Sequence, residues 1–246
     1  MYQVVGYHRP ASVGEALHLL GTGDRVALAG GVHMHHDGGA APSEVVDLQA
    51  VGLDTVQTDG TTVRLGAMVR LQAVADHAGL PETVQRAARA EQPSTLRSLA
   101  TIGGTIATAH GDSLLLASLL VYGAVVRLST EQSGERTLPL SDLLVEGRRE
   151  AELILDVTIE TAGISAIGRP GRTPADVPIL GVVGRRTGDG DAAVTVLAVC
   201  GIGAVPMLIE PDGLEALQPI DDHRSTASYR RHLVAVQAAR VLKELS

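Results

Sequence analysis

Two glycine pairs are the residues of this chain whose type and position most clearly suggest chemistry. Gly30-Gly31 ends the apolar run RVALAGG, and Gly103-Gly104 lies in TIGGTIATA. Glycine lets the backbone bend sharply or lets another group approach it closely, because it has no Cβ. N–H groups at such bends can hold phosphate oxygens without help from Lys or Arg. The pairs therefore predict one shared anion site, although each pair alone is also typical of a tight turn.

Other motifs of this kind are absent or unspecific. Neither glycine pair belongs to a G-x-G-x-x-G or G-x-x-x-x-G-K-[ST] pattern. The segment HMHHDGG contains His33, His35, His36 and Asp37, but their spacing matches no defined metal site. We therefore predict no metal site there, and interpret these residues as a solvated loop or a ligand contact. No set of Ser, His, Asp or Cys residues suggests a catalytic arrangement, so we predict no catalytic residue.

Composition and charge exclude several classes of protein. The chain has 246 residues, of which 45% are apolar and 2% aromatic, so its core must be aliphatic. Its net charge of −8 argues against nucleic-acid binding, which needs a basic surface. A single cysteine, Cys200, excludes an intrachain disulfide and an iron–sulfur cluster with cysteine ligands from this chain alone.

No apolar segment predicts a membrane span, which needs about 20 residues. The longest apolar run, 114–126, is interrupted by Ser118, Tyr122 and Gly123. The first residues, MYQVVGYHRP, lack the charged and apolar regions of a secretion signal. A cytoplasmic location is the resulting expectation.

The pattern of apolar residues predicts an α/β unit at the N-terminus. Ser12 and Glu15 have the spacing of a capping box, which predicts a helix through Leu20. Strands are expected at 25–29 and 44–51. Farther along, we expect helices at 71–78, 81–90, 114–120 and 225–245, and strands at 61–68, 124–130, 152–160, 179–186 and 192–200. The Gly- and Pro-rich stretch 163–178 predicts a domain boundary or a long functional loop, and GDGD predicts a hairpin turn.

Several segments occur in the order typical of one known family. They are ALAGG (27–31), VDLQAVGLDTV (46–56), VRLGAMVRLQAV (63–74), RSLATIGGTIATA (97–109), RTPADVPI (172–179) and DDHRSTASYRRHL (221–233). With them the chain resembles, over nearly its whole length, the FAD-binding medium subunit of molybdenum hydroxylases such as carbon monoxide dehydrogenase and xanthine dehydrogenase. The resemblance implies an α+β fold. Residues 1–163 would form a PCMH-type FAD-binding domain of two α/β parts, and 164–246 a shortened C-terminal domain with an antiparallel sheet and helices.

The resemblance also implies a cofactor site. The FAD diphosphate would lie across both glycine turns, held by the backbone amides of 27–34 and 101–105, and Gly103→Val would lose flavin while largely keeping the fold. The implied cofactor-binding residues are Ala27, Leu28, Ala29, Gly30, Gly31, Val32, His33, Met34, Thr101, Ile102, Gly103, Gly104, Thr105, Thr108, Asp112, Leu155 and Arg169.

Three positions depart from the family pattern. Val32 replaces a Thr, and Thr105 replaces the Asn of TIGGN. Leu114 stands where the family has an acidic residue, with Asp112 nearby as a candidate substitute. Three lost polar contacts of about 1 kcal/mol each would weaken binding by about two orders of magnitude.

The function implied by the resemblance is electron transfer. The flavin would take electrons from iron–sulfur clusters on a small partner subunit, which drain a molybdopterin centre on a large subunit, and would pass them to an external acceptor. A dimer of heterotrimers is the implied assembly. The alternative is a degenerate member without flavin that serves the same complex as a structural or assembly subunit, which Val32, Thr105 and Leu114 favour.

Overall fold

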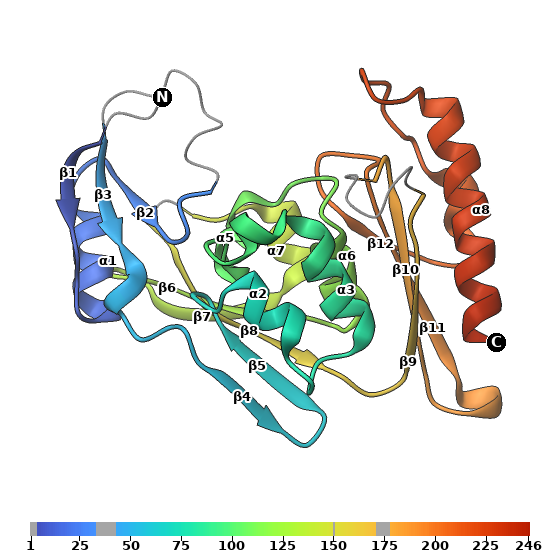
Figure 1. Ribbon diagram of the computed structural model, residues 1–246, viewed down its shortest axis with the longest axis horizontal. Helices are drawn as coiled ribbons and strands as arrows, with labels where there is room; N and C mark the ends of the chain where they lie inside the picture. Colours follow the sequence, from blue (N-terminus) through green and yellow to red (C-terminus); the bar gives the residue numbers. More distant parts are fainter. Residues whose placement is uncertain (1–3, 33–42, 150, 171–177) are drawn as a thin grey trace.

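Three β-sheets follow one another along the molecule, with most of the helices between the second and the third (Figure 1). The computed structural model describes residues 4–32, 43–149, 151–170 and 178–246. The strands are β1 (Val4–His8), β2 (Arg25–Leu28), β3 (Ser43–Asp47), β4 (Val56–Asp59), β5 (Thr62–Gly66), β6 (Val125–Thr130), β7 (Gly134–Pro139), β8 (Leu153–Glu160), β9 (Ile164–Gly168), β10 (Gly181–Thr187), β11 (Val194–Cys200) and β12 (Met207–Ile209). The α-helices are α1 (Val13–Gly21), α2 (Leu71–Asp76), α3 (Glu82–Glu91), α4 (Ser94–Arg97), α5 (Ile102–Thr108), α6 (Leu114–Val121), α7 (Leu140–Glu146) and α8 (Ala227–Leu245).

The first sheet has the strand order β1-β3-β2, with both pairs parallel. Helix α1 packs on it, and Ser12 caps this helix by accepting a hydrogen bond from the N–H of Glu15, as the capping-box spacing predicts. We predicted a strand over 44–51, but β3 ends at Asp47 and a 3-10 helix, η1 (Leu48–Ala50), follows. The Asp47 carboxylate accepts a hydrogen bond from the N–H of Gln49. This bond stabilises the 3-10 turn and so favours it over a continuation of the strand.

The second sheet is antiparallel, in the order β4-β5-β8-β6-β7. Its central strand, β8, is buried along nearly its whole length. Leu153 and Leu155 pack with α1, whereas Ile154, Val157 and Ile159 belong to the main core. Burial on both faces explains why the strand reads as a nearly continuous apolar run.

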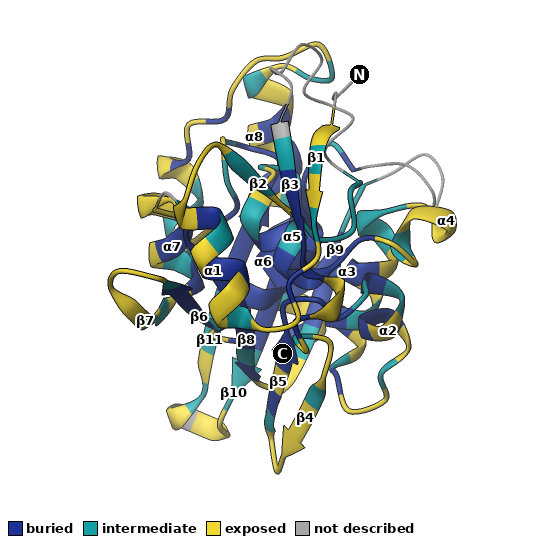
Figure 2. Cartoon of the chain, turned by 90° about the vertical axis from the view of Figure 1, so that its left-hand side faces the viewer, coloured by how far each residue is buried: buried dark blue, intermediate teal, exposed yellow. Residues whose placement is uncertain are grey.

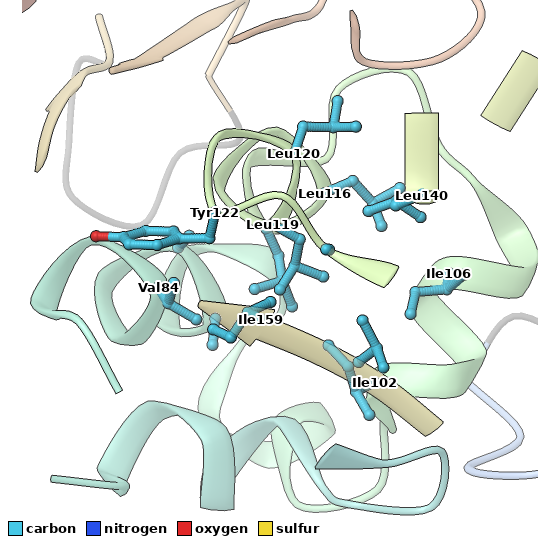
Figure 3. Close-up of a cluster of buried hydrophobic side chains, with 14 of the residues drawn as sticks. Val84, Ile102, Ile106, Leu116, Leu119, Leu120, Tyr122, Leu140 and Ile159 are labelled. Atoms are coloured by element: carbon cyan, nitrogen blue, oxygen red, sulfur yellow. The ribbon is translucent and has the colours of Figure 1, made fainter. Parts of the chain in front are cut away.

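Helix α6 is the centre of the molecule, and all eight of its residues are buried. It contacts β10 and β11 of the third sheet as well as α3 and α7, so an apolar residue is favoured on every side. Figure 3 shows its Leu116, Leu119 and Leu120 among other buried side chains, including Ile102 and Ile106 of α5. The residues around the start of α5 are therefore anchored in the main core.

The third sheet is antiparallel, in the order β12-β11-β10-β9, and α8 covers the face away from α6. Strand β9 lies in the stretch 163–178, where we predicted a domain boundary or a long loop, so the loop interpretation is wrong for Ile164–Gly168. Ile164 to Gly168 pair with β10 despite the glycines and proline around them. The predicted hairpin joins β10 to β11, but its connection contains a 3-10 helix, η2 (Gly190–Ala192), instead of a two-residue turn.

The α+β fold with an N-terminal α/β part and a C-terminal antiparallel sheet is confirmed. Cys200 is fully buried, and burial raises the pKa of its thiol to about 12, which makes it an inert thiol at neutral pH. Figure 2 shows that exposed residues concentrate on the outer strands and loops, around a buried centre. Among the described helices, none is both long and apolar enough to cross a lipid bilayer.

Candidate functional site

A cavity of about 480 Å³ opens between the first sheet, the start of α5 and the segment that joins α7 to β8. Its size is within the range of about 300–1,000 Å³ that is typical of small-molecule sites. Its lining consists of Leu20, Arg25, Val26, Ala27, Ala29, Gly30, Gly31, Val32, Leu48, Ala67, Met68, Ala100, Thr101, Gly103, Gly104, Thr105, Ala107, Thr108, Arg148, Arg149, Ala151, Glu152, Leu153 and Ile154. Both glycine pairs therefore border the same cavity, although Gly31 and Gly103 are 72 positions apart in the sequence (103 − 31).

The first glycine turn follows β2 directly. A Cβ at Gly30 would lie 2.1 Å from the carbonyl oxygen of Leu99, so only glycine allows the two backbones to touch. Gly31 has a φ of +68°, which a side chain would strain. No hydrogen bond joins the N–H of Gly31 or Val32 to another described residue. This turn therefore offers backbone donors at the cavity wall that have no acceptor in the described part of the chain.

The second glycine turn is the first turn of α5 and is built differently. The N–H of Ile102 donates to Val69 and that of Gly103 to Ala67, at 2.9 and 2.8 Å. The N–H of Gly104 donates to the hydroxyl of its N-cap Thr101 at 3.1 Å, and the N–H of Thr105 donates to the Thr101 carbonyl. These four amides already have protein acceptors, so they are not free donors in this structure, and their contact with phosphate stays a prediction.

A side chain would meet different surroundings at Gly103 and at Gly104. A Cβ at Gly103 would lie 2.6 Å from the Cβ and 2.7 Å from the carbonyl oxygen of Ala67, closer than atoms pack. A Cβ at Gly104 would meet only the Thr101 hydroxyl, at 3.1 Å. Gly103 is thus required by packing against β5 and its continuation, and this overlap predicts that Gly103→Val disturbs the fold, in contrast to the expectation from the sequence.

Ten of the seventeen predicted cofactor residues line the cavity. They are Ala27, Ala29, Gly30, Gly31, Val32, Thr101, Gly103, Gly104, Thr105 and Thr108. Leu28, Ile102, Asp112, Leu155 and Arg169 are not part of the lining. His33 and Met34 lie outside the described residues, as do the other residues of the histidine-rich segment. In the described parts of the chain, no group of three or more His, Cys, Asp or Glu residues could hold a metal ion.

Two of the residues outside the lining are engaged elsewhere. The Asp112 carboxylate pairs with the guanidinium of Arg224 at 2.9 Å, which ties the segment before α6 to the C-terminal region. Its role as a substitute for the family's acidic residue stays a prediction, and Leu114 at that position is buried. Leu155 packs with α1 and Met68 in a separate cluster, while Leu153, two residues earlier on the same face of β8, reaches the cavity.

The sequence interpretation missed the charged wall of the cavity. Arg148, Arg149 and Glu152 come from the segment between α7 and β8, and Arg25 comes from β2. An available indication was the basic pair in VEGRREAEL, directly before the best predicted strand. This basic pair is far from both glycine pairs in the sequence, so its place at the site could not be predicted. The pairing of β8 with β5 and β6 brings it to the cavity.

Glu152 is a buried carboxylate whose charge is neutralised within the wall. The Arg136 guanidinium donates to both of its oxygens, at 2.6 and 2.9 Å, and the N–H of Arg149 donates at 3.0 Å. Burial raises the pKa of Glu152, but the hydrogen bonds from Arg136 and from the Arg149 amide lower it by more, so its pKa lies below the ordinary value. Glu152 is thus ionised and paired at neutral pH.

Residues 2–160 match the family described as FAD binding domain in molybdopterin dehydrogenase, and the chain belongs to this family. FAD is therefore the cofactor of its class, and the chain is a flavoprotein component of an oxidoreductase. Uncharacterized protein YgfM of Escherichia coli strain K12 is 27% identical over 248 residues, covering 95% of this chain and 93% of its own length. The same protein from Escherichia coli O157:H7 is equally similar.

The fold matches several solved structures over its full length. A chain of quinoline 2-oxidoreductase from Pseudomonas putida 86 is 18% identical, with a TM-score of 0.88. A chain of carbon monoxide dehydrogenase from Hydrogenophaga pseudoflava is 21% identical, with a TM-score of 0.89. Each comparison covers 100% of this chain and 98% of the other. These matches show that the fold is shared.

The residues around the cavity fit a dinucleotide of the FAD type. The wall at Gly104 and Gly31 has no side chain, so a ligand can approach the backbone closely. Gly31 and Val32 supply N–H groups without acceptors in residues 4–32, 43–149, 151–170 and 178–246, and Arg148 and Arg149 supply positive charge for an anion. The apolar members of the lining, including Met68 and Leu153, can contact an uncharged part of the ligand.

Proposed function

We propose that the chain binds FAD in this cavity and serves as the electron-transfer subunit of a molybdenum hydroxylase. The observation that carries the proposal is that both glycine pairs, on separate parts of the fold, border one cavity in a member of an FAD-binding family. When bound, the flavin accepts and releases electrons, and the protein supplies binding and orientation.

The chain's own residues have distinct tasks in this proposal. Gly31 and Val32 donate backbone hydrogen bonds to the diphosphate, and Gly30 fixes their position by packing on Leu99. Gly104 provides a bare surface beside them, and the hydroxyl of Thr108 lies on the same wall. The predicted contacts of Leu28, Ile102, Asp112, Leu155 and Arg169 are not part of the proposal, because the cavity does not include them.

The partners follow from the same proposal. With one cysteine, this chain cannot ligate an iron–sulfur cluster with four cysteines, so a small iron–sulfur subunit would deliver electrons. A large molybdopterin subunit would oxidise the substrate, and an external acceptor would reoxidise the flavin. We further propose the division into residues 1–163 and 164–246, a dimer of heterotrimers as the assembly, and a cytoplasmic location.

A visible absorption spectrum of the purified protein, alone and with its co-expressed partner subunits, tests the proposal. The expected result is the spectrum of a bound oxidised flavin, released as FAD on denaturation, and bleached when the complex turns over. A colourless protein that takes up no added FAD, yet still associates with both partner subunits, would support the flavin-free structural role instead.

A further inference from the structure

We propose that Arg149, with Arg148 beside it, forms a cationic part of the cavity wall that binds the diphosphate together with the first glycine turn. The inference rests on the proposed function and assigns a role to residues that the glycine motifs do not include. It follows from counting the charges and hydrogen-bond donors that border the cavity.

The glycine turns themselves supply few donors and no cationic side chain. Residues 27–32 and 101–108 contain neither Lys nor Arg. Four amides of the second turn already have protein acceptors, whereas the N–H groups of Gly30, Gly31, Val32 and Thr101 have none among the described residues. A few neutral donors are a weak match for a diphosphate with two negative charges, above all in a chain of net charge −8.

Of the three arginines in the lining, Arg25 is already neutralised. Its Nε donates to the Glu44 carboxylate at 2.7 Å, and Nη1 donates to the carbonyls of Leu19 and Thr22. The carboxylate of Glu152, the acidic member of the lining, is satisfied by Arg136 and by the N–H of Arg149. Neither Arg25 nor Glu152 therefore changes the charge that a ligand experiences by much.

Arg148 and Arg149 remain, and neither forms an ion pair with a carboxylate of the described residues, although both lie in the field of Glu152. Nη1 of Arg148 donates to the backbone carbonyl of Glu152 at 2.8 Å, which orients the side chain without neutralising it. The Arg149 guanidinium has no acceptor among the described residues. Its backbone is held in place by the hydrogen bond to Glu152. A guanidinium on a fixed backbone, exposed at a cavity wall and without a carboxylate partner, is suited to bind phosphate oxygens in a bidentate manner.

The experiment compares ligands that differ in charge, using the full-length protein freed of flavin. Affinity for FAD, ADP and riboflavin is measured by calorimetry for the wild type, Arg149→Gln, Arg149→Lys and the control Arg64→Gln. Arg64 is exposed on β5, outside the lining. We expect Arg149→Gln to weaken FAD and ADP binding by about tenfold or more, since one charge-assisted bond is worth about 1.5–3 kcal/mol. Riboflavin binding should be unchanged, Arg149→Lys should recover part of the loss, and the control should behave as wild type.

The outcomes separate this inference from the proposed function. If the wild type binds FAD and Arg149→Gln binds it within twofold, the role of Arg149 is refuted while the flavoprotein proposal stands. An equal loss of riboflavin affinity in Arg149→Gln also refutes the inference, because the effect then does not depend on phosphate. If the wild type binds none of the three ligands, the proposed function fails, and the inference fails with it. Circular dichroism of each variant shows that a loss of binding is not a loss of fold.

Discussion

The two glycine turns border the same cavity, but one is an open turn at the end of a strand and the other is part of a helix packed into the core. The first leaves the N–H groups of Gly31 and Val32 without acceptors among the described residues. The second has used four consecutive N–H groups in its own cap and in contacts with Val69 and Ala67. Similar glycine pairs thus have different roles. The first turn offers backbone hydrogen-bond donors, and the second offers a rigid surface without side chains.

Neighbouring glycines of the second turn provide the strongest test of this difference. Gly103→Ala should lower the free energy of unfolding by about 2–3 kcal/mol, because the new Cβ would overlap the backbone of Ala67. Gly104→Ala should change it by less than about 1 kcal/mol, since alanine favours a helix and only the Thr101 hydroxyl must adjust. Urea unfolding of both variants measures the difference. Equal losses would show that the second turn is not held by packing.

In the first turn, Gly31 should matter through its backbone conformation. Gly31→Ala places a side chain at a φ of +68°, which costs about 1–2 kcal/mol. Gly52, with a φ of +77° and open space around its Cβ position, is a matched control outside the cavity. Both variants should lose similar stability, but only Gly31→Ala should also weaken FAD binding. An unchanged FAD affinity in Gly31→Ala would contradict the assignment of donors to this turn.

Thr101 should affect stability more than binding. Thr101→Val removes the hydroxyl that accepts from the N–H of Gly104, which should cost about 1 kcal/mol as for other N-caps. Thr101→Ser keeps an acceptor and should stay close to wild type. Because the N–H groups of 102–105 already have acceptors, FAD affinity should change little in either variant once the fold is intact. A large loss of FAD affinity in a folded Thr101→Val protein, with affinity kept in Thr101→Ser, would show that the hydroxyl binds the cofactor directly.

Local pattern was enough to predict most of the fold. The capping box at Ser12, the apolar runs of β8 and α6 and the amphipathic α8 each depend on neighbours in sequence. Strand β9 was missed because its pairing with β10 outweighs the glycines and proline near it. Tertiary contacts of this kind are not visible in local propensity.

The site was predictable only in part, for the same reason. The glycine pairs could be recognised, and the structure places both at one cavity. The protein acceptors of the amides of 102–105, the pairing of Asp112 with Arg224 and the arrival of Arg149 at the cavity all depend on contacts between distant segments. Such contacts decide whether a hydrogen-bond donor or a charged side chain is available to a ligand. The sequence shows only that the donor or the charge is present.

The smallest expected effect is a loss of stability in the first sheet, but not in α5, when the pH falls. The first turn follows a strand of the small first sheet, and Glu44 links the three strands of this sheet. Its carboxylate accepts a hydrogen bond from Arg25 at 2.7 Å and contacts the His8 ring at 2.8 Å. The hydrogen bond from Arg25, followed by that from His8, holds the pKa of Glu44 below its ordinary value of 4.5. A lowered pKa means that the folded state binds fewer protons than the unfolded state in this range. The stabilisation is therefore present above about pH 4.5 and is lost as the pH falls through the lowered value.

The second turn has no such dependence, because apolar packing of Ile102 and Ile106 supports it. Hydrogen exchange, corrected for its intrinsic pH dependence, should show protection in β1 and β3 falling as the pH drops below about 4.5 while α5 keeps its protection. Glu44→Gln should remove most of this pH dependence. The effect should be small, because Glu44 is partly exposed and ion pairs at the surface contribute little. Equal loss of protection in α5 and in the first sheet would mean that the two turns share one support, and that the contrast between them is wrong.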